Sequence, residues 1–236
     1  MVHKNRIAAL AFLSVCLALF VALRFHAVDN SVTEEDKRYI AKILRGESVG
    51  TPSGKKRYEE EIAYIVRVQK AVLETASGQI GIPFDVPREP KQLYLAKSGL
   101  CYDRSRVIEK ILRAAAFETR HISIFSTRKT DSALKSLITP GVASHAVTEV
   151  LTSKGWLVVD SNHLWLSLDR EDRPVSIEQL HALGTAAIEW KEPVPTDIYE
   201  GPFTFVYGLY SRHGRFYPPY DPLPDVNYGE LIQNLF

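Results

Sequence analysis

Residues 98–116 read SGLCYDRSRVIEKILRAAA. The apolar residues in its second half recur at helical spacing, so the stretch predicts a helix from Cys101 to near Ala116. Cys101 would lie in the first turn, two turns before Ile108, on the side that faces the core. The amino end of a helix carries partial positive charge and free N–H groups, which favour a thiolate and can stabilise an oxyanion. Position alone leaves two interpretations: a nucleophile, or a structural thiol at a helix start.

The first 27 residues predict the compartment. Seventeen uncharged residues run from Ile7 to Leu23, after Lys4 and Arg6. This length is at the low end for a bilayer span and long for the core of a signal peptide, so we expect a retained membrane anchor, with a cleaved signal as the alternative. The basic residues place the amino terminus in the cytoplasm. The expected location is therefore the cytoplasmic (inner) membrane, single-pass, with the residues after the anchor extracytoplasmic, in the periplasm.

The sequence has two cysteines, Cys16 inside the apolar span and Cys101 beyond it. They cannot pair across the membrane boundary, so an exported domain keeps one unpaired thiol. In an oxidising compartment such a thiol is a liability unless it is buried or used. This favours the interpretation of Cys101 as a nucleophile.

Three strand-like runs follow the Cys101 helix. Residues 119–125 alternate as a half-buried strand does, and 144–150 and 156–159 predict a β-hairpin. A loop of residues 152–155 pairs Leu151 with Trp156, which puts His145 and Asp160 on one face, one diagonal step apart. A thiol nucleophile needs a base that a third group orients, and this His and Asp provide that arrangement.

Together these residues resemble the transglutaminase-like (transglutaminase-core) superfamily of cysteine enzymes, as a bacterial-type membrane-anchored member. The resemblance covers roughly residues 90–165 and rests on Cys101, His145 and Asp160, which match the catalytic Cys, His and Asp of the family in order and spacing. Glu149 and Trp156 match supporting residues beside them. Val147 and Ser161 depart from the pattern, since many members have Trp at the first position and Pro at the second.

The resemblance implies a papain-like α+β fold, with the nucleophile helix packed on an antiparallel sheet that bears His145 and Asp160. It also implies thiolate attack on an amide or other acyl carbonyl, with transfer of the acyl group to water or an amine. Cys101 N–H would be one oxyanion donor, and Gln92 or Tyr94 a second. No cofactor and no metal is predicted, and the expected substrate is a peptide, a protein or a polymer of the cell envelope.

The rest of the chain predicts support for this core. Helices are expected from about residue 34 to Gly46 and from Tyr58 to Thr75, and a Pro-containing loop from Gly78 to Ser98. The predicted domains are an anchor at 1–27, a helical linker region at 28–80, the catalytic core at 81–190 and a Pro/Tyr-rich extension at 191–236. This extension either wraps the core or borders the cleft through residues 217–220.

Charge excludes one class of partner. Residues 1–27 hold three basic and no acidic residues, so the rest holds 26 basic and 28 acidic residues, a net charge of −2. This removes the electrostatic footprint of a nucleic-acid binder. His121, His163, His181 and His213 are interpreted as surface or core residues. The alternative to an enzyme is a catalytically silent binding module for an envelope partner; the oligomeric state is not predicted.

Overall fold

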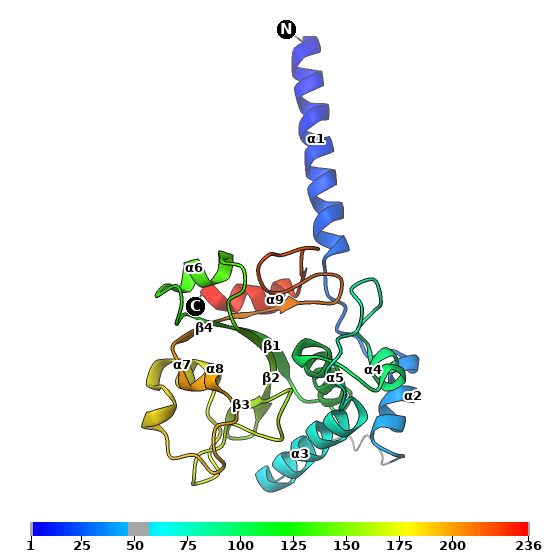
Figure 1. Ribbon diagram of the computed structural model, residues 1–236. Coiled ribbons are helices and arrows are strands. Elements are labelled where there is room, and N and C mark those ends of the chain that lie inside the picture. The colour runs from blue at the N-terminus through cyan, green and yellow to red at the C-terminus, as the bar shows by residue number, and fades with distance from the viewer. Residues whose placement is uncertain (1, 47–56, 236) are drawn as a thin grey trace.

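The computed structural model describes residues 2–46 and 57–235, and its helices and strands surround a central antiparallel sheet (Figure 1). The elements are α1 (Val2–Phe25), α2 (Glu34–Ile43), α3 (Tyr58–Thr75), α4 (Pro90–Ala96), α5 (Cys101–Ala114), β1 (Thr119–Ser126), α6 (Ala133–Ile138), β2 (Ser144–Thr152), β3 (Gly155–Val159), α7 (Ile177–Leu183), η1 (Thr185–Ala187), α8 (Asp197–Glu200), β4 (Phe203–Tyr207), β5 (Leu209–Tyr210), β6 (Asp225–Val226), α9 (Tyr228–Leu231) and η2 (Ile232–Leu235).

The central sheet has the strand order β3-β2-β1-β4, with antiparallel pairing throughout. In the β2–β3 hairpin Leu151 pairs with Trp156 and Thr148 with Val159. This confirms the predicted register. Since Asp160 directly follows β3, it emerges beside the start of β2, where His145 lies.

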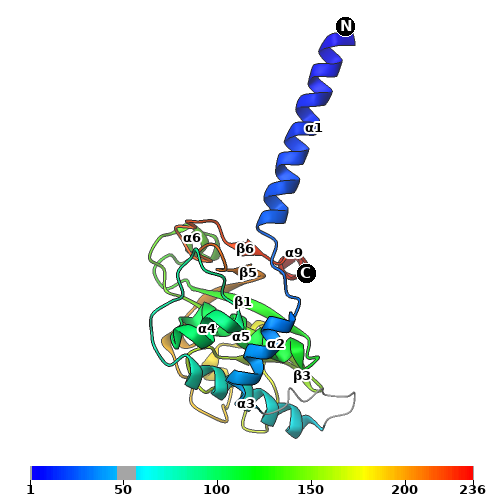
Figure 2. The same cartoon turned by 90° about the vertical axis from the view of Figure 1, so that its right-hand side faces the viewer.

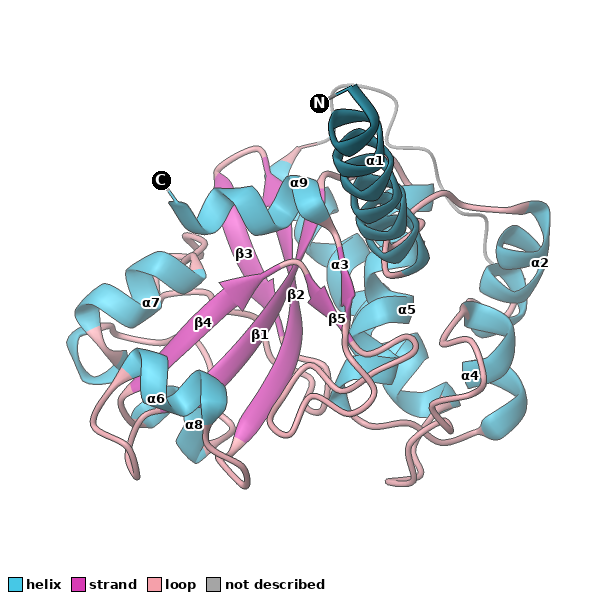
Figure 3. Cartoon of the chain, turned by 90° about the horizontal axis from the view of Figure 1, so that it is seen from above, coloured by secondary structure: helices cyan, strands magenta, loops and turns pink. Residues whose placement is uncertain are grey.

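Helices cover both faces of the sheet (Figure 3), and each face has its own apolar cluster. On one side α2, α3 and α5 pack against residues such as Val150 and Leu157. On the other, α7 and the segment around Tyr199 pack against Ile122 and Val158. The mixed helix and antiparallel-sheet architecture agrees with the predicted α+β fold.

Two local predictions were wrong. Strand β1 is not half-buried, because it is covered on both faces and only Ser126 is partly exposed. The polar residues on the face opposite Ile122 and Ile124 have buried partners instead: Ser123, for example, donates to Leu209 O at 3.0 Å. The loop predicted at residues 78–98 contains α4, which begins at Pro90, because proline is well tolerated in the first turn, where its missing N–H costs no helical bond.

The N-terminal helix α1 extends away from the rest of the molecule (Figure 2). A search of the described residues finds no helix that combines the length and the apolarity that a bilayer crossing requires. The predicted membrane helix is therefore not supported. The predicted break at residues 50–54 lies outside the described residues.

The segment after α1 joins the folded domain. Val28 N donates to Val226 O at 3.1 Å, so residues next to α1 add to β6. Buried Arg106 of α5 also donates to Asp29 O, at 2.6 Å. The chain that follows α1 is thus part of the packed structure.

Candidate active site

Helix α5 begins at Cys101, as predicted, and Asp103 fixes its first turn. The Asp103 carboxylate accepts hydrogen bonds from Leu100 N at 2.9 Å and Ile82 N at 3.1 Å, and pairs with Arg88 at 2.9 Å. Both charged side chains are almost fully buried. Asp103 therefore satisfies free N–H groups at the helix start and ties that start to the preceding loop.

Replacing Asp103 by alanine should destabilise the fold by about 3–5 kcal/mol, because it leaves the Arg88 charge buried without its carboxylate. Urea unfolding of the full chain measures this. The matched control is Glu189→Ala, which removes an exposed carboxylate paired with Arg170 and should cost less than about 1 kcal/mol. Equal losses in the two variants would contradict the role assigned to Asp103.

The Cys101 thiol is partly exposed and lies at the edge of an apolar cluster. This cluster is centred on Tyr102, Phe125 and Phe216, which come from α5, β1 and the C-terminal segment. Tyr217 also packs against it, and Tyr220 donates to Leu137 O at 2.7 Å. The C-terminal segment thus reaches the surroundings of the thiol, as one of the two sequence interpretations expects.

His145 and Asp160 are in direct contact. His145 Nε2 lies 2.8 Å from Asp160 Oδ2, and both side chains are buried. Nε2 is thereby occupied, and Cys101 lies near enough to His145 to contribute to the raised pKa of its imidazole. The structure thus brings together the three side chains that the sequence analysis singled out.

Burial lowers the pKa of His145, but the charge of Asp160, its hydrogen bond and the neighbouring Cys101 outweigh it and raise this pKa to about 10. His145 is therefore an imidazolium at neutral pH.

This raised pKa predicts a pH-dependent stability. Between the ordinary histidine value of about 6.5 and the folded value of about 10, the folded chain holds a proton that the unfolded chain has lost. The stabilisation from His145 is complete below about pH 6.5 and disappears as the pH rises to about 10. The difference in unfolding free energy between wild type and His145→Ala should therefore shrink from pH 7 to pH 10, measured by urea unfolding. A pH-independent difference would contradict the assignment.

Four donors surround the Asp160 carboxylate. Oδ1 accepts from the backbone N–H groups of Asn162 and His163, both at 2.7 Å. Oδ2 accepts from His145 and from the Tyr199 hydroxyl, at 2.6 Å in the second case. Burial raises the pKa of Asp160, but the charge of His145 and the side-chain hydrogen bonds from His145, His163 and Tyr199 hold it well below its usual range. Asp160 is a permanent carboxylate that orients His145.

Two buried side chains hold the loop after β3. Gln69 of α3 donates to the carbonyl oxygens of Asp160 at 2.7 Å and Trp165 at 2.8 Å. Arg104, one turn after Cys101, donates to Asn162 Oδ1 at 2.7 Å and to Ala76 O at 2.9 Å. Together they fix the Asp160 loop relative to the helix that carries the thiol. Neither residue was identified from the sequence.

Other sequence candidates have different surroundings. Tyr94, one of the two proposed oxyanion donors, contacts Tyr39 and lies 3.6 Å beneath the Lys97 ammonium. Gln92 has a buried amide oxygen without a hydrogen-bond partner among the described residues, and its role as a donor stays a prediction. His163 is a neighbour of the site, because its ring Nδ1 lies 3.3 Å from Asp160 Oδ1.

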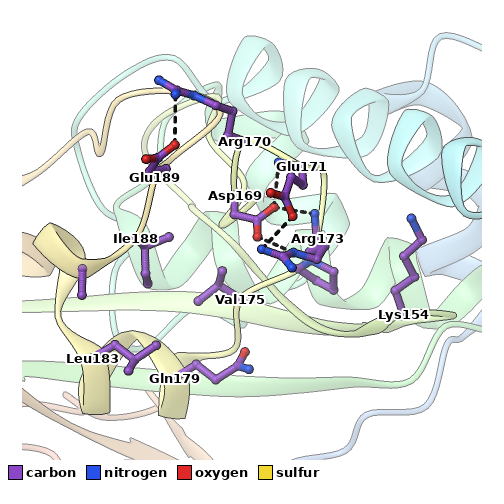
Figure 4. Close-up of a pocket in the computed structure, with 12 residues that line it drawn as sticks. Lys154, Asp169, Arg170, Glu171, Arg173, Val175, Gln179, Leu183, Ile188 and Glu189 are labelled. Carbon is purple, nitrogen blue, oxygen red and sulfur yellow. Dashed lines mark hydrogen bonds and ion pairs between the residues drawn. The ribbon is translucent and has the colours of Figure 1, made fainter.

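A separate cavity of about 890 Å³ lies beside the β2–β3 turn, α7 and η1, and none of Cys101, His145 and Asp160 lines it (Figure 4). Its charged side chains pair with one another, for example Arg170 with Glu189 at 2.9 Å and Arg173 with Asp169 at 2.7 Å. These pairs leave little unsatisfied charge to attract a charged ligand.

The region around the site matches a known protein family. Residues 52–161 match the model of the transglutaminase-like superfamily, Transglut_core. The chain contains a transglutaminase-like domain. The matched range includes Cys101, His145 and Asp160 and ends at the residue after Asp160. Members of the superfamily are generally cysteine peptidases or acyltransferases, although some are inactive. No curated protein sequence matches the chain significantly.

Some residues that contact the site lie outside the range that matches the transglutaminase-like superfamily. Tyr199 and the edge strand β4 both lie after residue 161. The departures from the family pattern have local explanations. Ser161 donates to Ala146 O at 2.6 Å, which ties the Asp160 loop to β2, and Val147 is buried in the apolar cluster on the α7 side.

Proposed function

We propose that the protein is a thiol enzyme in which Cys101, His145 and Asp160 form a catalytic triad that acts on amide or peptide bonds. The contact that carries this proposal is the 2.8 Å hydrogen bond between His145 and Asp160, with the thiol of Cys101 near His145 at the start of α5. A nucleophile, a base and an orienting carboxylate in this order are the components of acyl transfer.

The proposed reaction has two steps. The Cys101 thiolate attacks the amide carbonyl, and the imidazolium of His145 gives its proton to the departing amine, which leaves an acyl-thioester. Water or an amine then attacks the thioester, and His145 takes the proton of this second nucleophile. Water gives a protease or amidase, and an amine gives transglutaminase-type transfer.

The N–H groups at the start of α5 support this mechanism. Cys101 is the first residue of the helix, and the first N–H groups of a helix have no intrahelical acceptor. The Cys101 N–H is therefore the proposed donor to the oxyanion that forms on attack.

The test is mass spectrometry of glutamine-containing peptides incubated with the full chain, with and without a primary amine. The proposal expects hydrolysed peptides, or amine adducts, that appear with wild type and not with Cys101→Ala. Products that form equally with both proteins would overturn it. Peptide binding that persists in Cys101→Ala, without turnover by wild type, would favour the binding module.

The location belongs to the proposal as well. Lys4 and Arg6 before the apolar stretch support an extracytoplasmic domain held at the inner membrane. Protease added to intact spheroplasts should then digest the domain. Digestion only after lysis would place it in the cytoplasm.

A further inference from the structure

Tyr199 lies outside the matched domain but contacts the proposed triad directly. It belongs to α8, in the C-terminal part of the chain, and its hydroxyl donates to Asp160 Oδ2 at 2.6 Å. That oxygen also accepts from His145 Nε2. Two side-chain donors therefore share one carboxylate oxygen at the centre of the proposed site.

The position of Tyr199 is fixed by packing. Its side chain is 1% exposed, and its ring lies 5.2 Å from that of Trp165 and 6.0 Å, edge to face, from that of His145. Asp160 is the hydroxyl's hydrogen-bond partner among the described residues. A buried phenol without a partner is costly, so this contact holds α8 to the Asp160 loop.

The phenol remains a donor at neutral pH. Burial and the adjacent charge of Asp160 both raise the pKa of Tyr199 well above its ordinary value. Its proton therefore stays on the oxygen and points to the carboxylate. A hydrogen bond of this kind takes up part of the negative charge on Oδ2.

We propose that Tyr199 is a positioning residue that tempers the charge of Asp160 and thereby sets how strongly His145 holds its proton; this rests on the proposed function. The backbone donors of Asn162 and His163 fix the other carboxylate oxygen, so the plane of the carboxylate does not depend on Tyr199. The contribution of the phenol is electrostatic: with it, His145 can release its proton to a leaving amine more easily. The C-terminal segment thus completes the site that the matched domain begins.

The test is an NMR titration of ¹⁵N-histidine-labelled full chain from pH 5 to 11, with His145 assigned by its absence in His145→Ala. In Tyr199→Phe the Asp160 carboxylate loses the hydrogen bond from the phenol, so its negative charge acts more strongly on His145. The midpoint of the His145 titration should therefore rise by about 0.5 pH units or more. The matched control is Tyr207→Phe, which removes the hydroxyl of another buried tyrosine bonded to a carboxylate, Glu178, away from the triad. The control should leave the midpoint unchanged.

An unchanged or lowered midpoint in Tyr199→Phe, or an equal rise in Tyr207→Phe, would overturn the inference. If Tyr199→Phe fails to fold, 3-fluorotyrosine at position 199 provides a second variant. Its phenol is a stronger donor, so the midpoint should fall, and a rise would overturn the inference.

The titration needs no substrate, so its result is independent of turnover. Iodoacetamide labelling of Cys101 in the same samples tests the proposed function separately. Rapid labelling in wild type with an unmoved midpoint in Tyr199→Phe rejects only the role of Tyr199. Slow labelling in wild type rejects the thiol enzyme.

Discussion

Cys101→Ala should abolish turnover of every substrate that the wild type converts, a loss of about 10⁴-fold or more. No other side chain of the proposed site can form the acyl-thioester, because His145 is buried against Asp160 and the nearby Tyr199 is a hydrogen-bond donor to the same carboxylate. The thiol is partly exposed, so its removal creates no closed cavity and should change the unfolding free energy by less than about 1 kcal/mol.

The matched control is Cys16→Ala. Cys16 is the other thiol of the chain and is exposed on α1. Turnover assays of both variants, beside their urea unfolding curves, separate chemistry from folding. Activity that survives in Cys101→Ala would contradict the assigned nucleophile, and activity lost in Cys16→Ala would point to an unrelated thiol requirement.

Asp160→Asn should lower turnover by about 10²- to 10⁴-fold while leaving a folded protein of reduced stability. The asparagine amide carries no charge and no longer stabilises the imidazolium of His145. Burial, which lowers the pKa of His145, is then unopposed by that charge, and this pKa should fall. His145 is then no longer an imidazolium at neutral pH. Each oxygen of the Asp160 carboxylate accepts two hydrogen bonds, whereas the asparagine amide keeps one oxygen and replaces the other with an NH₂ group. The donors that face this NH₂ group lose their acceptor, at a cost of about 1–3 kcal/mol.

The control for this variant is Asp169→Asn. Asp169 also accepts backbone hydrogen bonds on one oxygen, from Glu171 and Arg173, but it lies in the separate cavity. Kinetics with any substrate found for the wild type, together with unfolding measurements, give the comparison. Equal activity of the two variants would show that the charge of Asp160 is not needed.

The sequence predicted the parts of the site that local rules determine. The helix start at Cys101 followed from the spacing of apolar residues after it, and the meeting of His145 with Asp160 followed from the two-residue period of a strand and the length of the hairpin loop. A loop one residue shorter would have placed them on opposite faces. Both inferences needed only residues close in sequence.

The parts that were missed depend on long-range packing. Tyr199 reaches Asp160 because α8 packs on the far side of the sheet, and nothing in its spacing from the triad indicates this. Gln69 and Arg104 looked like ordinary polar residues of helices, because the carbonyl groups that they bind lie in distant loops. For β4 a signal existed, since Phe203–Tyr207 consists of aromatic and β-branched residues that favour strands, but the surrounding prolines led to the prediction of an irregular extension.

The reactivity of Cys101 toward iodoacetamide across pH tests the central claim most directly. Mass spectrometry of the full chain measures the labelling of Cys101, and the urea-unfolded chain provides the reference rate of an ordinary thiol. If His145 and Asp160 activate the thiol, Cys101 is labelled about 10-fold or more faster in the folded chain than in the unfolded chain at pH 6, and this advantage disappears in His145→Ala. If Cys101 is labelled no faster in the folded chain than in the unfolded chain at pH 6, or if His145→Ala leaves its rate unchanged, the thiol is structural and the proposed triad is wrong.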